Sequence, residues 1–214
     1  DQIAQSPEEK LLFRGNEVMV RSNPLFEEPQ ISHFQTGVVL SFGEIKKIPV
    51  SENTYRNLTR SEICDKALVF EGSFLQILIY EGTCEVITDR FGSIPMFYAI
   101  SDRSELVLSN CYNDVIKRLT VGEAGQIQEE TIFCFLYLRR LLGDQTFHSR
   151  VFTLPAGSIT KVNLRSKLCS VDQYWVPAAP SIFESGLATE LLAEKLQSAV
   201  ERSLQPSIVG MVLC

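Results

Sequence analysis

The feature that most constrains the fold of this chain is a hairpin pattern over residues 74–89. Residues 74–80 read FLQILIY and are rich in the β-branched and aromatic residues that favour strands. Glu81-Gly82 is a tight-turn pair, and residues 84–89 (CEVITD) predict the returning strand. Because the first arm is apolar at almost every position, both of its faces need cover. The pattern therefore predicts inner strands of a sheet with a layer on each side.

A second strand pair is predicted immediately after a corner at residues 91–95. Its arms are residues 96–100 and 105–109, with a polar turn between them. Strands that follow one another closely usually pair with each other. We therefore expect a four-stranded antiparallel meander over residues 74–109. Further strands are predicted at residues 37–45 and 158–163, and a hairpin at residues 11–22.

Three helices are predicted in the first 176 residues. The first begins after Thr59, with Glu62 at the position that completes a capping box. The second covers residues 112–119. The third covers residues 129–142, with acidic residues at its start and Gly143 after its end, as helix-terminus preferences predict.

A Pro- and Ala-rich stretch near residue 177 predicts a domain boundary. We divide the chain into a first domain at 1–176, a linker at 177–186 and a second segment at 187–214. The second segment predicts a helix at 187–204 and a wholly apolar strand at 208–213. One helix and one strand cannot bury their own apolar surfaces. We therefore expect 187–214 to be the truncated start of an α/β domain.

The composition is that of an ordinary globular protein, and its charge excludes some partners. The chain has 214 residues, 45% of them hydrophobic, and a formal net charge of −6. An acidic chain is a poor candidate for binding nucleic acid or anionic membranes. No apolar run approaches the ~20 residues of a spanning helix, and residues 1–10 lack the order of a secretion signal. We expect a cytoplasmic protein that binds neither nucleic acid nor membrane.

Cysteine and histidine give no pattern typical of a metal site. The six cysteines are scattered, without a CxxC pair or zinc-type spacing, and are interpreted as small buried hydrophobes in a reducing compartment. The two histidines, His33 and His148, are both predicted to lie in surface loops. No metal ligand and no Cys–His catalytic pair is predicted.

Residues 88–98 (TDRFGSIPMFY) resemble the Arg-Asp-Arg-Phe-Gly-x-x-Pro-Leu-Tyr-Tyr stretch of the asparagine synthetase family. Shorter similarities at residues 71–74, 108–110, 154–157 and 174–175 follow in the family's order. Residues 208–213 are similar to the strand before the family's pyrophosphatase loop. The resemblance covers about residues 71–214, and its specificity comes from the shared order of the short matches.

The resemblance implies an α+β fold in two parts. The first is an Ntn-hydrolase-like αββα sandwich that, in active relatives, releases ammonia from glutamine. The second is an ATP-pyrophosphatase domain that activates a carboxylate as an acyl-adenylate for attack by an amine. ATP and Mg²⁺ would belong to the parent enzyme, with Leu213 and Cys214 at the start of the ATP-binding loop. This chain would need no cofactor, and its expected partner is its own C-terminal synthetase domain.

Glutamine hydrolysis is expected to be lost. The family's nucleophile is a cysteine at the mature N-terminus, whereas this chain begins with Asp1 and its first cysteine is Cys64. The family's Asn-Gly-Glu oxyanion segment corresponds to Phe42, Gly43 and Glu44, and Phe42 cannot donate a hydrogen bond. Loss of one such donor costs roughly 10²–10³ in rate. We therefore assign no catalytic residue and expect no glutamine binding.

The resemblance assigns a structural role near the domain interface to Asp89, Arg90, Gly92 and Pro95. An Asp-Arg pair could also be mistaken for a catalytic pair. We interpret these residues as a corner held by charge-assisted hydrogen bonds.

Three functional hypotheses follow. The first is a glutaminase-inactive domain that serves as a scaffold in an asparagine-synthetase-like amide ligase. The second is a functional glutamine-hydrolysing asparagine synthetase whose N-terminal cysteine is missing from this chain. The third is a free-standing, non-catalytic interaction domain. A homodimer is an open alternative, because a helix and strand rich in Leu and Val can pair with a second copy.

Overall fold

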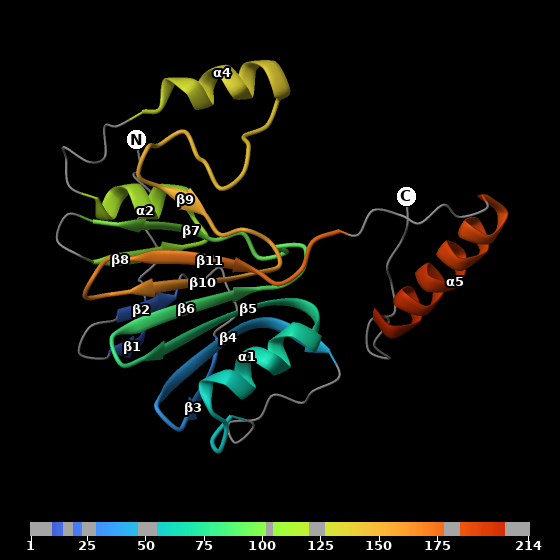
Figure 1. Cartoon of the computed structure of the whole chain (residues 1–214), viewed down its shortest axis with the longest axis horizontal. Coiled ribbons are helices and arrows are strands. Elements are labelled where there is room, and N and C mark those ends of the chain that lie inside the picture. The colour runs from blue at the N-terminus through green and yellow to red at the C-terminus, as the bar shows by residue number, and fades with distance from the viewer. Residues whose placement is uncertain are drawn as a thin grey trace, which may run out of the picture. The chain divides into compact units, whose positions relative to one another are not determined.

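The structure is a computed structural model that describes residues 10–14, 19–22, 29–46, 55–101, 105–119, 127–177 and 185–203 (Figure 1). The chain divides into two compact units, Asp1–Val176 and Pro177–Cys214. The first unit contains antiparallel sheets and helices in separate layers, so the predicted α+β class is confirmed.

The larger sheet of the first unit has six antiparallel strands in the order β11-β10-β6-β5-β4-β3. The strands are β3 (Gln30–Phe34), β4 (Gly37–Lys46), β5 (Glu71–Tyr80), β6 (Thr83–Thr88), β10 (Ser158–Asn163) and β11 (Cys169–Gln173).

The predicted hairpin is confirmed as β5 and β6, which pair from Leu75↔Thr88 to Tyr80↔Thr83. Its turn places Glu81 at φ 44° and Gly82 at φ 72°. Positive φ at both central residues is what a two-residue turn needs to match the twist of its strands. Glycine adopts this conformation without strain, whereas Glu81 is held there by the hairpin.

The predicted four-stranded meander is wrong. The strands β7 (Phe97–Ile100) and β8 (Leu106–Ser109) do pair, but they belong to a second sheet of order β8-β7-β9, completed by β9 (Phe152–Thr153). On the side of β6 that faces away from β5, the neighbouring strand is instead β10, in register Ile159↔Ile87. The corner after β6 takes the chain out of the larger sheet, and a strand distant in sequence occupies the place beside β6.

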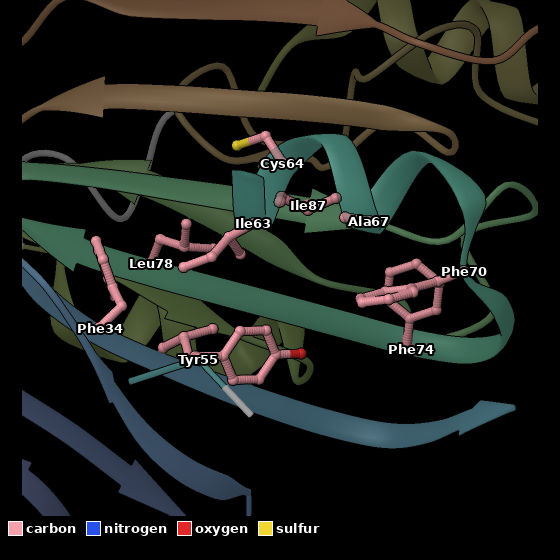
Figure 2. Close-up of a cluster of buried hydrophobic side chains, with 10 residues drawn as sticks. Phe34, Tyr55, Ile63, Cys64, Ala67, Phe70, Phe74, Leu78 and Ile87 are labelled. Atoms are coloured by element: carbon pink, nitrogen blue, oxygen red, sulfur yellow. The ribbon is translucent and has the colours of Figure 1, made fainter. Parts of the chain in front are cut away.

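Three hydrophobic cores define the layers of the first unit. The first core lies between α1 (Arg60–Val69) and one face of the larger sheet, and Figure 2 shows Ile63 and Ala67 of α1 grouped with sheet residues such as Leu78. The second core lies between the two sheets and contains Leu40, Leu75 and Val86 from one and Tyr98 from the other. The third core joins α2 (Tyr112–Arg118) to the smaller sheet. The layers therefore run α1, larger sheet, smaller sheet, α2 (Figure 1).

Strand β5 contributes to both cores of the larger sheet. Phe74 and Leu78 belong to the α1 core, and Leu75 and Ile77 belong to the core between the sheets. Alternate residues of a strand point to opposite faces. The predicted cover on both sides of this strand is confirmed.

The helix predictions differ in accuracy at the helix ends. The capping box of α1 is confirmed: the Glu62 N–H donates to Thr59 Oγ1 (3.3 Å) and the Thr59 N–H donates to Glu62 Oε2 (2.8 Å). Helix α4 (Glu129–Leu138) is shorter than predicted. It ends where Arg139 adopts a left-handed conformation (φ 57°), before Gly143.

Three strands occur where no strand was predicted: β3, β9 and β11. β3 occupies part of the polar stretch that was interpreted as a loop around His33, and His33 pairs with Val38 of β4. Its alternation is clear in the structure, with Ser32 and Phe34 buried and His33 exposed. β11 is exposed at all five positions. Such edge strands are stabilised by pairing with a neighbour, and their composition alone does not identify them.

The second unit is described for α5 (Ser185–Ser203), which confirms the predicted helix. The predicted strand at 208–213, together with Leu213 and Cys214, lies outside the described residues. In the first unit, β1 (Lys10–Arg14) and β2 (Met19–Ser22) form the predicted N-terminal hairpin, and the residues of its turn lie outside the described range. Among the helices that the structure describes, none has the length and apolar character needed to cross a membrane.

Candidate functional site

The segment predicted to correspond to an oxyanion site lies in the C-terminal half of β4. Phe42 is paired with Leu75, and its ring is half-buried against the core between the sheets. Gly43 has φ 78°, and a Cβ there would collide with the Ser73 carbonyl oxygen, so only glycine fits. The backbone of Glu44 continues the ladder opposite Ser73. The segment thus presents an apolar packing residue where the resemblance implies a hydrogen-bond donor.

The predicted corner is built around the carboxylate of Asp89, which is 1% exposed. Asp89 Oδ1 accepts from the Phe91 N–H (2.8 Å) and the Ser93 hydroxyl (3.2 Å). Asp89 Oδ2 accepts from the Ser93 N–H (3.0 Å) and the Phe74 N–H (3.3 Å). A buried carboxylate is stable only with such partners, and these bonds join the end of β6 to the start of β5. We refer to residues 88–95 as the Asp89 corner.

Segments distant in sequence are attached to the Asp89 corner by hydrogen bonds. Thr88 Oγ1 donates to the Pro155 carbonyl (2.7 Å), and the Ser158 N–H donates to Thr88 Oγ1 (3.1 Å). The Gly157 N–H donates to the Asp89 carbonyl (2.8 Å), and the Tyr174 hydroxyl donates to the Thr88 carbonyl (2.6 Å). Burial, followed by the nearby Asp89 charge, raises the pKa of Tyr174 to about 12, so this hydroxyl keeps its proton.

Of the other predicted corner residues, Gly92 lies close to the chain at Ala156, whereas Arg90 and Pro95 are exposed. Gly92 has φ 61°, and a Cβ there would lie 3.2 Å from the Ala156 Cβ. Arg90 and Pro95 are exposed, and Arg90 Nη2 lies 3.5 Å from the Leu68 carbonyl. Phe91 is 78% exposed and makes a T-shaped contact with Trp175 at 5.3 Å between ring centroids. The structure therefore brings these predicted residues together around one turn.

A buried ion cluster under α1 was not predicted from the sequence. Glu85 of β6 has a fully buried side chain and accepts two hydrogen bonds from the Arg60 guanidinium (2.7 and 2.6 Å). Lys161 Nζ lies 3.5 Å from Glu85 Oε1 on the adjacent strand β10. Burial by itself raises the pKa of Glu85. Hydrogen bonds from Arg60 and Tyr80, together with the two positive charges, outweigh burial and hold that pKa below its usual range.

The one sequence signal for this cluster is a charged residue inside an otherwise apolar strand. Glu85 lies between Cys84 and Val86, both buried, and a charge in such a place needs a partner. Its main partner, Arg60, is 25 residues away and on a helix. The strand pattern therefore indicates that a partner exists but does not identify it.

Cys64 lies beside this cluster and is not set up as a nucleophile. Its Sγ is 3.9 Å from Glu85 Oε2 and its side chain is buried in the α1 core. Burial raises the pKa of the Cys64 thiol to about 11, and the Glu85 charge acts in the same direction. The thiolate is the reactive form of cysteine, so this position disfavours nucleophilic chemistry.

The two histidines differ from each other and from the prediction. His33 is exposed, as expected, although it lies on β3 and not in a loop. His148 is 3% exposed, so its prediction as a surface residue is wrong. His148 forms an isolated β-bridge with Ile127, and the adjacent Phe147 contacts Phe135 of α4 at 5.4 Å between ring centroids.

In the part of the chain that the structure describes, no three His, Cys, Asp or Glu side chains are grouped so that they could hold a metal ion. Neither the known protein-family models nor the characterised proteins compared with this chain include a match.

Proposed function

We propose that residues 1–176 form the non-hydrolytic, Ntn-hydrolase-like domain of an asparagine-synthetase-like, ATP-dependent amide ligase. Its role is that of a scaffold for the domain that carries out carboxylate activation. The observation that carries the proposal is the layer order α1, larger sheet, smaller sheet, α2. That order agrees with the αββα sandwich that the resemblance over residues 71–214 implies.

The Asp89 corner supports the same assignment. Residues 88–98, the longest similar stretch, contain the point where the chain passes from the larger sheet to the smaller one. The hydrogen bonds of Asp89 and Thr88 hold this crossing together. A family motif whose function is to build the fold can be kept by a domain that no longer hydrolyses glutamine.

The absence of hydrolysis is supported by the chemistry of two positions. Phe42 packs in the core and cannot stabilise an oxyanion, and Gly43 offers only its backbone. Cys64 is a buried thiol whose pKa is raised. ATP and Mg²⁺ are proposed for the activating domain alone, and no step is assigned to them because Leu213 and Cys214 lie outside the described residues.

The test is a pair of assays on the whole natural protein that carries this chain, with its native N-terminus. We expect no ammonia release from glutamine above background. We also expect ATP–pyrophosphate exchange, with a suitable carboxylate, that does not depend on glutamine. The Cys64→Ser variant is the matched control and should leave both results unchanged.

Each outcome separates the hypotheses. Robust ammonia release would overturn the non-hydrolytic assignment and support a functional glutamine-hydrolysing synthetase. Absence of exchange with every carboxylate tested would overturn the ligase assignment. It would then favour a non-catalytic interaction domain, which the exposed apolar side chains Phe133, Leu136 and Tyr137 of α4 also favour.

A further inference from the structure

Helix α4 is attached to the rest of the first unit along one of its sides. On that side Thr131 is fully buried, and Phe135 contacts Phe147 at 5.4 Å between ring centroids. Ile132 lines a pocket that it shares with side chains of α2. A helix that packs along one side normally presents polar residues on the other side, where water covers it.

The opposite side of α4 is apolar instead. Phe133, Leu136 and Tyr137 are 62%, 59% and 87% exposed. Residues spaced by three and four positions share one face of a helix, and at 3.6 residues per turn this face points away from Thr131. We refer to these three side chains as the outer face of α4. A contiguous exposed apolar surface commonly marks an interface.

Charges of opposite sign lie at the two ends of the outer face. Glu129 and Glu130, the acidic pair, begin the helix, and Arg139 and Arg140, the basic pair, follow its last residue; all four are exposed. None of these four side chains forms an ion pair with another residue that the structure describes. This order of charges suits the dipole of α4 itself, but it does not cover the apolar residues between the two pairs.

The order acidic, apolar, basic is complementary to its own reverse. When two copies of α4 lie antiparallel about a point between residues 134 and 135, the acidic pair of each copy faces the basic pair of the other. The same register places Phe133 opposite the partner's Leu136, so apolar contacts and charge contacts agree. A parallel arrangement would instead place like charges together. Two-fold interfaces between identical chains require this self-complementarity.

We propose that the outer face of α4 is the interface of a homodimer in which two copies of this helix pack antiparallel. Burial of the outer face provides the attraction, and the charge pairs fix the direction of the partner helix. A contact centred on one helix of 10 residues is small beside the roughly 1,600 Å² of a standard protein–protein interface. The dimer should therefore dissociate on dilution.

The test uses the whole natural protein that carries this chain. Sedimentation velocity over a concentration series measures the dimer dissociation constant. Leu136→Lys places a charge against the partner's Phe133 and should weaken the dimer roughly 10-fold or more. The matched control is Leu168→Lys, at a leucine that is 72% exposed and lies outside α4, which should leave the dissociation constant unchanged.

Charge reversal tests the antiparallel order. The variants E129R/E130R and R139E/R140E each place like charges at both ends of the dimer, so each should weaken it roughly 10-fold or more at low salt. A 1:1 mixture of the two variants restores opposite charges at both ends. The mixed dimer should therefore form with a dissociation constant within about 3-fold of the wild-type value. Because the mixture contains the same variant chains, this recovery excludes unfolding as the cause of the loss.

Three results would each overturn the proposal: a monomeric wild type, equal dissociation constants for L136K and L168K, or a mixture that dimerises no more tightly than either charge variant alone. If the wild type is monomeric and the amides of α4 are protected from hydrogen exchange, another segment of the same protein covers the outer face. None of these measurements involves glutamine or ATP, so their outcome is independent of the proposed ligase function.

Discussion

Glu85 shows how one residue can connect three elements of the fold. Its carboxylate belongs to β6, its bidentate partner Arg60 to α1, and Lys161 to β10. Glu85 is fully buried whereas the Arg60 side chain is 40% exposed. Removal of Arg60 therefore leaves a buried carboxylate with Lys161 as its remaining cation, which is the costly way to break a buried pair.

We predict that Arg60→Met lowers the free energy of unfolding by about 3 kcal/mol, at the low end for a buried pair because Arg60 is partly exposed. The double variant R60M/E85Q should recover part of the loss, since it removes the buried charge that has lost its bidentate partner. Urea denaturation measures both. The control is Lys117→Met, which breaks the exposed Lys117–Asp114 pair (3.3 Å) and should cost less than about 1 kcal/mol. A loss for R60M as small as that of the control would contradict the prediction.

The pH dependence of stability follows from the same carboxylate. The pKa of Glu85 is lowered in the folded state, so its contribution to stability is present above the ordinary glutamate pKa of about 4.3 and is lost as pH falls through the lowered value. Wild type should therefore be more stable than Glu85→Gln at pH 7, with the difference shrinking below about pH 4. Paired urea titrations from pH 7 to pH 2.5 measure it. A difference that does not change with pH would show that Glu85 is not held ionised by its partners.

At the scale of the element, the Asp89 corner carries the chain from the larger sheet to the smaller one. The predicted meander had placed the next strand beside β6 in the same sheet. Asp89 accepts four hydrogen bonds with its side chain, three of them from backbone N–H groups. We predict that Asp89→Asn destabilises the chain by about 2–4 kcal/mol, because the amide loses the charge and one acceptor atom.

The control for the corner is Pro95→Ala, at an exposed position of the same turn, which should change stability by about 0.5 kcal/mol or less. Thermal unfolding followed by circular dichroism compares the two. If D89N and P95A shift the midpoint equally, the Asp89 hydrogen bonds do not hold the corner.

Predictability also differs between elements. The capping box of α1 and the turn of the β5–β6 hairpin were predicted because both depend on residues within four positions of one another. The end of α4 was missed, since its exposed apolar residues continue the helical pattern past Arg139. The edge strand β3 was missed because its polar letters are typical of a loop, and its pairing with β4 decides its structure.

On the scale of the whole molecule, the two sheets enclose a core that neither forms alone. Strand β5 is covered by this core on one face and by α1 on the other, whereas β11 is exposed at every position. We predict that the backbone amides of Ile77 and Leu78 exchange with solvent only through global unfolding, and that those of β11 exchange far faster. Hydrogen exchange followed by NMR measures this. Equal protection of the β5 and β11 amides would contradict the difference in burial between these two strands.

The sequence by itself determined the local structures of this protein: the hairpin at 74–88, the capped start of α1, the helix at 112–118 and the α+β class. Each depends on backbone preferences and on the period of apolar residues within a short window. It also predicted which residues surround the corner, though not the bonds that Asp89 makes.

Only the tertiary structure decided which distant segments meet. β10 lies beside β6, Arg60 reaches Glu85, and His148 is buried although its local sequence is typical of a surface turn. The physical reason is the same in each case. Burial and pairing depend on contacts between segments that are distant in sequence and meet only when the chain folds. A short stretch of sequence contains one of the partners but not the other.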